Sequence, residues 1–193
     1  MRLMAKGTKV FIAGSRRLVR LSKDVKLRID NIVDKGFTVF IGDANGVDRA
    51  VQQYLSSKNY DKVTVFCMAG GCRNNVGDWP TRIIAAPDGS RRDFSYYSTK
   101  DRAMVAETDY GLMLWDGKSR GTLRSIVDLV RQNKPVVVYV ASQNAFRTLR
   151  QSDELADLLN HVDPAALRDI DSELRAFATN EGAVRKGDAA GLF

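Results

Sequence analysis

Short apolar stretches alternate with amphipathic stretches from Lys9 to Val140. The apolar stretches are short and almost continuous, which is typical of strands that are buried on both faces. The stretches between them repeat apolar residues at spacings of three and four, as at Val25, Ile29 and Ile32, and this predicts helices with one buried face. Five strands are predicted, at 9–13, 38–41, 63–66, 110–115 and 136–140.

Strands that alternate with amphipathic helices predict an α/β fold. We expect a Rossmann-like three-layer sandwich with a mainly parallel sheet of about five strands, plus a C-terminal helical extension. Residues 1–141 are predicted to form the Rossmann-like nucleotide-binding domain, with a lid-like insertion at 68–98 that is long and rich in aromatic residues and arginine. Residues 142–193 are predicted to form the helical extension, which ends in a flexible, Gly/Ala-rich tail.

The loops that enter the predicted strands are plain turns, whereas the loops that leave them carry glycines, arginines and acids. In an open parallel sheet the loops after the strands meet at one crevice, which is the usual ligand site. Glycine-bearing turns that open a helix also suit phosphate, because unpaired amides and the helix dipole meet there. The residues predicted to bind phosphate or ligand are Gly14, Ser15, Arg16, Gly42, Asn45, Gly46, Gly117, Lys118, Ser119, Gly121 and Thr122.

Carboxylates at the same crevice need a different explanation, because they repel phosphate. Asp43 and Asp116 each end a predicted strand, so we expect them to accept hydrogen bonds from ribose hydroxyls, to hold Mg²⁺ or to act in catalysis. These carboxylates make Mg²⁺ a possible cofactor, but the sequence does not require a cofactor. In the insertion, Arg73, Trp79 and Tyr96 are candidates for closing over the ligand and stacking on a base, with packing of the lid itself as the alternative.

Cys67 and Cys72 have no histidine near them in the sequence, so they make a poor zinc site and no metal is predicted. We expect two reduced thiols. No apolar run is long enough to span a membrane, and none near the N-terminus suits a signal peptide. Together these features favour a cytoplasmic protein that does not enter a membrane.

Three segments together resemble the SLOG superfamily, which includes the LOG phosphoribohydrolases and the DNA-processing protein DprA. They are Gly14-Ser15-Arg16, Gly42 to Asp48 and Asp116 to Thr122. The stretch from Lys100-Asp101 to Lys134-Pro135 also looks like nucleoside deoxyribosyltransferases. The resemblance covers roughly residues 8–141 and implies binding of a nucleotide or a nucleotide-derived ligand. LOG enzymes carry a catalytic glutamate where this chain has Ser125, so N-glycosidic hydrolysis or transfer would have to use Asp43 or Asp116 instead.

The net charge of +7 favours polyanionic partners, although the basic residues are spread along the chain and also suit a solubilising surface. The main prediction is a sensor or binding protein for a nucleotide. The alternatives are an N-glycosidic enzyme acting on nucleotides and a DprA-like binder of single-stranded nucleic acid, with weak and salt-sensitive binding expected. Because the helical extension offers apolar residues beyond the needs of the core, and because SLOG relatives commonly pair, a homo-oligomer is also expected.

Overall fold

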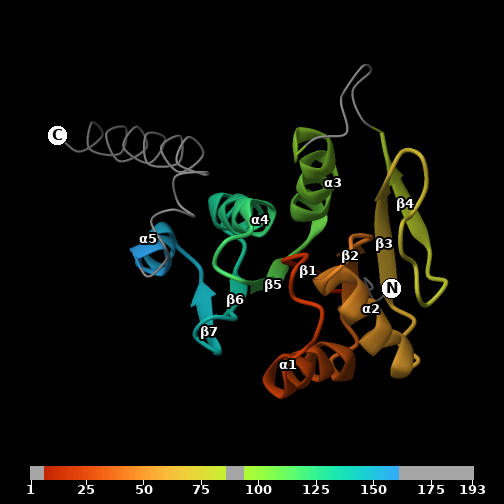
Figure 1. Ribbon diagram of the computed structural model, residues 1–193, viewed down its shortest axis with the longest axis horizontal. Coiled ribbons are helices and arrows are strands. Elements are labelled where there is room, and N and C mark those ends of the chain that lie inside the picture. Colours follow the sequence, from red (N-terminus) through yellow and green to blue (C-terminus); the bar gives the residue numbers. More distant parts are fainter. Residues whose placement is uncertain (1–6, 86–93, 161–193) are drawn as a thin grey trace, which may run out of the picture.

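A sheet between two layers of helices organises the described part of the chain (Figure 1). The computed structural model describes residues 7–85 and 94–160. Its elements are β1 (Lys9–Gly14), α1 (Lys23–Asp34), β2 (Thr38–Gly42), α2 (Val47–Ser57), β3 (Val63–Met68), β4 (Thr81–Ile84), α3 (Phe94–Glu107), β5 (Tyr110–Trp115), α4 (Arg120–Arg131), β6 (Val136–Val140), β7 (Ala145–Leu149) and α5 (Ser152–Asn160).

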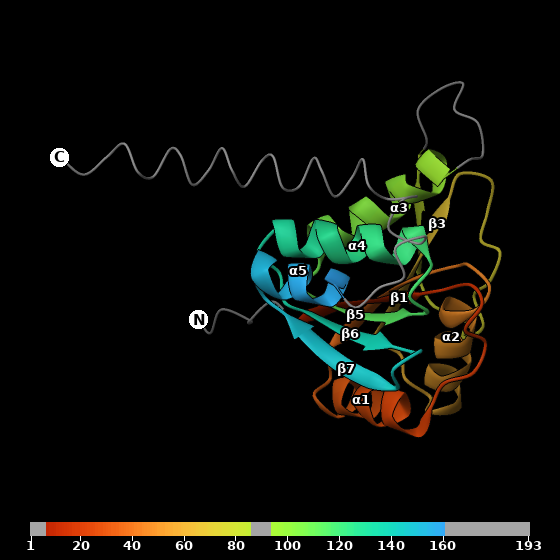
Figure 2. The same ribbon diagram turned by 60° about the vertical axis from the view of Figure 1, so that its left-hand side comes forward.

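The sheet has the strand order β4-β3-β2-β1-β5-β6-β7. All neighbouring strands are parallel except β6 and β7, which are antiparallel. Helices α1 and α2 cover one face, and α3, α4 and α5 cover the other, as the two views of Figures 1 and 2 show. The predicted Rossmann-like three-layer sandwich is therefore confirmed.

Each face of the sheet has its own apolar core, because successive side chains of a strand point to opposite faces. In β1, Phe11 packs into the core under α3, α4 and α5, whereas Val10 and Ile12 pack into the core over α1 and α2. All three side chains are completely buried. This two-sided burial is the physical reason for the continuous apolar strands in the sequence.

The sheet has seven strands rather than about five, since the strands at its two edges were not predicted. Strand β4 lies inside the segment 68–98, which we expected to be a lid, and most of its residues are exposed. Strand β7 lies inside 142–193, the predicted helical extension, and has a largely exposed or half-buried pattern. An edge strand has fewer buried neighbours, so neither segment shows the apolar continuity that reveals the central strands.

Helix α5 agrees with the helical character predicted for the residues after Ser152. The rest of the predicted helical extension and the predicted flexible tail lie outside the described residues. Within 7–85 and 94–160, no helix is both long enough and apolar enough to cross a membrane.

Cys67 and Cys72 form a disulfide with their Cα atoms 5.1 Å apart, so the prediction of two reduced thiols was wrong. Cys67 is the buried penultimate residue of β3, and the chain turns back through Gly70-Gly71 to bring Cys72 beside it. The prediction failed because the sequence does not show this turn. The pair consequently gives no support to a reducing compartment.

Candidate functional site

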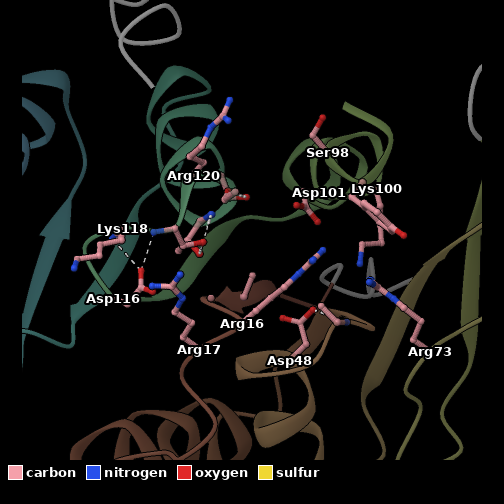
Figure 3. A pocket seen from close by; sticks show the side chains of 18 residues that line it. Arg16, Arg17, Asp48, Arg73, Ser98, Lys100, Asp101, Asp116, Lys118 and Arg120 are labelled. Atoms are coloured by element: carbon pink, nitrogen blue, oxygen red, sulfur yellow. Dashed lines mark hydrogen bonds between the residues drawn. The ribbon is translucent and has the colours of Figure 1, made fainter. Parts of the chain in front are cut away.

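A pocket of about 530 Å³ lies where the loops after β1, β2 and β5 meet the start of α3. Figure 3 shows that side chains from these separate segments surround one space, which Arg16 enters. Its charged lining combines six basic and three acidic residues, which are Arg16, Arg17, Arg73, Lys100, Lys118, Arg120, Asp48, Asp101 and Asp116. The predicted convergence of the loops that leave the strands therefore produces a pocket at the carboxyl edge of the sheet.

One side of this pocket, which we call the anion end, is formed by the N-terminus of α4 with Arg17, Lys118 and Arg120. Ser119 caps the helix, and its Oγ accepts hydrogen bonds from the Thr122 amide at 3.4 Å and the Thr122 hydroxyl at 3.0 Å. The first amides of a helix have no partner inside the helix, and the helix dipole places partial positive charge there. With three cationic side chains nearby, this end suits a phosphate.

Asp116 lines the pocket but also holds the loop at the anion end together. Its Oδ1 accepts hydrogen bonds from the amides of Lys118 at 3.0 Å and Ser119 at 2.8 Å. Burial acts to raise the pKa of Asp116, but these bonds and a contact with Ser15 outweigh it and lower the pKa. Asp116 is thus an ionised carboxylate that shapes the turn before α4.

The opposite side, which we call the carboxylate end, contains Asp48, Asp101 and Lys100. Asp48 is 6% exposed in the first turn of α2, and its Oδ2 accepts a hydrogen bond from the Ala44 amide at 3.1 Å. Burial raises the pKa of Asp48 to about 6, although Lys100 acts in the opposite direction. Burial also raises the pKa of Asp101, against the lowering effect of Lys100 and Arg16. The two carboxyl groups are therefore held where ionisation is disfavoured.

Asp43 lies behind this end and is not part of the pocket lining. Its carboxylate accepts hydrogen bonds from Arg73 at 2.7 Å and 3.2 Å and pairs with the buried ammonium of Lys100 at 2.8 Å. Burial alone would raise the pKa of Asp43, but Arg73 and Lys100 hold it far below its usual value. Asp43, which was predicted to bind a sugar or act in catalysis, positions two cations that line the pocket.

The predicted glycines mainly let the loops approach one another. A Cβ at Gly46, where φ is +81°, would lie 2.3 Å from the Arg16 carbonyl oxygen. A Cβ at Gly42 would lie 2.5 Å from Oδ2 of Asp48. A Cβ at Gly14 would lie 2.3 Å from the Leu114 carbonyl oxygen of β5, and Gly14 also borders the pocket. Of these three glycines, only Gly14 belongs to the pocket lining, so Gly42 and Gly46 contribute by close packing.

Three further residues that were predicted to bind the ligand, Ser15, Asn45 and Gly117, belong to the loops around the pocket. Ser15 is completely buried, and its Oγ accepts a hydrogen bond from the Asp116 amide at 3.1 Å, which joins the loops after β1 and β5. Asn45 is exposed and accepts a hydrogen bond from Asn74 at 3.1 Å. Gly117 has a φ of +79° within the turn before α4. None of these three is among the residues that line the pocket, whereas Arg16, Lys118, Ser119, Gly121 and Thr122 are.

Trp79 and Tyr96, which were predicted to stack on a base or to pack the lid, both make packing contacts. The indole N–H of Trp79 donates to the Tyr60 carbonyl at 2.8 Å, and the Tyr96 hydroxyl donates to the Ala69 carbonyl at 2.9 Å. Both side chains are buried, and neither lines the pocket. Tyr97 lines it in their place, with the Arg16 and Arg73 guanidinium carbons 5.5 Å and 4.9 Å from its ring centre.

Helix α3 brings three pocket residues that sequence reasoning missed, which are Ser98, Lys100 and Asp101. The available signal was the Lys100-Asp101 pair, which stands out in the resemblance to deoxyribosyltransferases. Ser125, at the position of the LOG glutamate, is buried one turn into α4 and borders the pocket. Its hydroxyl donates to the Gly121 carbonyl at 3.2 Å.

The described residues contain no group of three or more His, Cys, Asp or Glu side chains that could hold a metal ion. Magnesium at the pocket would therefore take most of its ligands from a bound phosphate and from water.

Comparisons with known proteins identify relatives in fold. The sequence matches no protein-family model and no curated protein. A structure of DNA processing protein A from Helicobacter pylori, described for its single-stranded DNA binding mode, is similar with a TM-score of 0.55 and 18% identity. The match covers 88% of this chain and 81% of that chain. DprA from Streptococcus pneumoniae is similar with a TM-score of 0.53 and 14% identity over 85% of this chain and 62% of that chain.

Proposed function

We propose that this protein binds a nucleotide or a nucleotide-derived ligand in the pocket at the carboxyl edge of its sheet. The observation that carries the proposal is the division of one pocket into an anion end at α4 and a carboxylate end at α2 and α3. A nucleotide has the matching division, since its phosphate is anionic and its sugar and base offer hydrogen-bond donors.

At the anion end, the dipole of α4 and the side chains of Arg17, Lys118 and Arg120 favour a phosphate. The pocket volume of about 530 Å³ exceeds the needs of a phosphate alone and falls within the range typical of small-molecule sites. The ligand is therefore larger than an inorganic anion, and its phosphate would occupy only one side of the pocket.

The proposal is tested by calorimetry against nucleoside mono- and diphosphates, cyclic nucleotides, ADP-ribose and NAD. We expect saturable binding of at least one of them, weakened about tenfold by Lys118→Ala or Arg120→Ala, because each removes a charge-assisted contact to phosphate. Lys35→Ala is the matched control, since Lys35 caps the far end of α1. The proposal is wrong if the folded protein binds none of these compounds, or if both pocket variants bind as the wild type does.

A second candidate function is binding of single-stranded nucleic acid. It is favoured by the fold similarity to DprA, one structure of which is described for its single-stranded DNA binding mode. One phosphate of a strand would occupy the anion end while Arg16 and Arg73 meet its neighbours. Asp48 and Asp101 oppose this function, because they repel a phosphate backbone that runs across the pocket.

A further inference from the structure

Three charged side chains of the pocket keep hydrogen-bonding capacity for a ligand. Across the part of the chain that the structure describes, Asp101 makes no hydrogen bond, and Asp48 accepts one only through Oδ2. Arg16 contacts the Tyr97 ring but makes no hydrogen bond through its guanidinium to those residues. Figure 3 shows the Arg16 side chain reaching into the space between Asp48 and Asp101.

The unused hydrogen-bonding capacity of these side chains differs from that of charged side chains on an ordinary surface, which water satisfies. Asp48 as a residue is more than nine-tenths buried, and the Oδ1 atom, which accepts no hydrogen bond from the described residues, remains open to the pocket, where a ligand or water can satisfy it. Water can fill the pocket in the free protein, and a ligand that replaces it gains contacts that are already in position.

The order of charges indicates which chemical groups fit. Acceptors at Asp48 and Asp101 alternate with donors at Arg16 and Lys100. A hydroxyl group donates one hydrogen bond and accepts others, so two adjacent hydroxyls can satisfy both kinds of side chain. An amino group only donates and would leave the cations unmatched, whereas a second phosphate only accepts and would be repelled by the carboxylates.

We infer that the carboxylate end binds the vicinal hydroxyls of a ribose whose phosphate occupies the anion end, so that the ligand is a ribonucleotide or another ribose phosphate rather than a deoxyribonucleotide. This inference rests on the proposed function and specifies its substrate class. The inference assigns sugar recognition to Asp48 and Asp101. The carboxylates predicted from the sequence, Asp43 and Asp116, hold loops and cations in place.

The test compares ribose 5-phosphate, 2-deoxyribose 5-phosphate and inorganic phosphate in titrations followed by NMR. The wild type should bind ribose 5-phosphate about tenfold more tightly than the deoxy compound, because a hydrogen bond to a charged group is worth about 1.5–3 kcal/mol. Asp101→Ala should reduce this preference to less than about threefold without weakening the binding of inorganic phosphate. Arg120→Ala should weaken both sugar phosphates equally.

Two further variants complete the test. Asp48→Asn keeps an acceptor for the Ala44 amide and should also reduce the preference, so the inference does not depend on the folding of one variant. Asp34→Asn removes a carboxylate at the far end of α1 and should have no effect. Equal affinity of the wild type for the two sugar phosphates overturns the inference but leaves the phosphate site standing. Failure of all three compounds to bind overturns the inference alone, because the proposed function is decided separately by the calorimetry against nucleotides.

Discussion

At the residue scale, Asp43 shows how a carboxylate can serve a binding pocket without entering it. Its side chain and that of Lys100 are each 3% exposed, and Arg73 completes the cluster. A buried ammonium that loses its partner is left with an uncompensated charge. Asp43 therefore stabilises both the fold and the arrangement of cations in the pocket.

We expect Asp43→Ala to lower the free energy of unfolding by about 3–5 kcal/mol, measured by urea denaturation at neutral pH. Glu107→Ala removes the partner of Arg82 in a more exposed pair and should cost about 1 kcal/mol or less. Adding Lys100→Met to Asp43→Ala should restore part of the loss, because the unpaired charge is then gone. A loss for Asp43→Ala no larger than that for Glu107→Ala would contradict this account.

Asp48 predicts a pH dependence of stability. Its pKa is raised by burial to about 6 from 3.8, so the native state holds a proton that the unfolded state has released. The stability associated with this proton is fully present below about pH 4 and is lost as the pH rises through about 6, by an amount on the order of 3 kcal/mol. Asp48→Asn cannot titrate at this position, so its stability relative to the wild type should increase between pH 4 and 7.

Chemical denaturation of both proteins at several pH values measures this difference. Asp43 contributes in the opposite direction, because its lowered pKa gives stability that is lost as the pH falls below its ordinary range. Asp43 is present in both proteins, so the difference between them reports on Asp48 together with its electrostatic coupling to Asp43 and Asp101. A constant difference between wild type and Asp48→Asn from pH 4 to 7 would refute the burial effect.

At the scale of elements, two glycines allow the cost of backbone strain to be distinguished from the cost of close packing. Gly46, before α2, and Gly117, before α4, both have positive φ angles, of +81° and +79°. A Cβ at Gly46 would overlap the backbone of Arg16, whereas at Gly117 the nearest atom is the Ser142 Oγ at 3.9 Å. The turn before α2 thus tolerates no side chain, and the turn before α4 has room for one.

We expect Gly117→Ala to cost about 1–2 kcal/mol, which is the strain of a left-handed alanine. Gly46→Ala should cost more, because the loop that carries Arg16 must also move. Thermal melts rank the two variants, and titration with a ligand that binds the wild type should show the larger loss of affinity for Gly46→Ala. Equal melting temperatures of the two variants would show that the loop after β1 can move without a loss of stability.

The disulfide joins the end of β3 to the segment that carries Arg73 into the pocket. Its cysteines are five positions apart, and closing so short a loop stabilises a protein by about 2 kcal/mol in the chain-entropy account. Dithiothreitol should therefore lower the free energy of unfolding of the wild type by about this amount. The double variant Cys67→Ala/Cys72→Ala should not respond to the reductant. Two reactive thiols in the unreduced, denatured wild type would disprove the pairing.

At the scale of the whole molecule, the charge of +7 favours association with any polyanion. Binding of this kind depends on released counterions and so weakens with salt. We expect a poly-dT oligonucleotide to lose most of its affinity between about 50 and 200 mM salt in fluorescence anisotropy, whereas a nucleotide in the pocket, which contacts fewer cations, should lose much less. Tight oligonucleotide binding at physiological salt that is abolished by Arg16→Ala would favour the DprA-like function.

The sequence alone was sufficient for the central architecture and for the edge of the sheet that carries the pocket. Strands β1, β2, β3, β5 and β6 lie at the predicted places, and Ser22, directly before α1, caps that helix. These features are local, because burial on both faces of a strand leaves a continuous apolar stretch and a cap depends on a few adjacent residues. Arg16, Lys118, Ser119, Gly121 and Thr122 were assigned to the pocket for the same reason, since they directly follow strands.

Only the tertiary structure decided which carboxylates face a ligand and which hold the site together. Asp43 and Lys100 lie 57 positions apart, and they meet because α3 packs against β2 and β3. Asp101 enters the pocket on that same helix, whose apolar pattern is too weak to have been predicted. The disulfide of Cys67 likewise depends on the turn after β3, which brings Cys72 beside it. Such contacts depend on long-range packing, which leaves no periodic signal in the residues that it brings together.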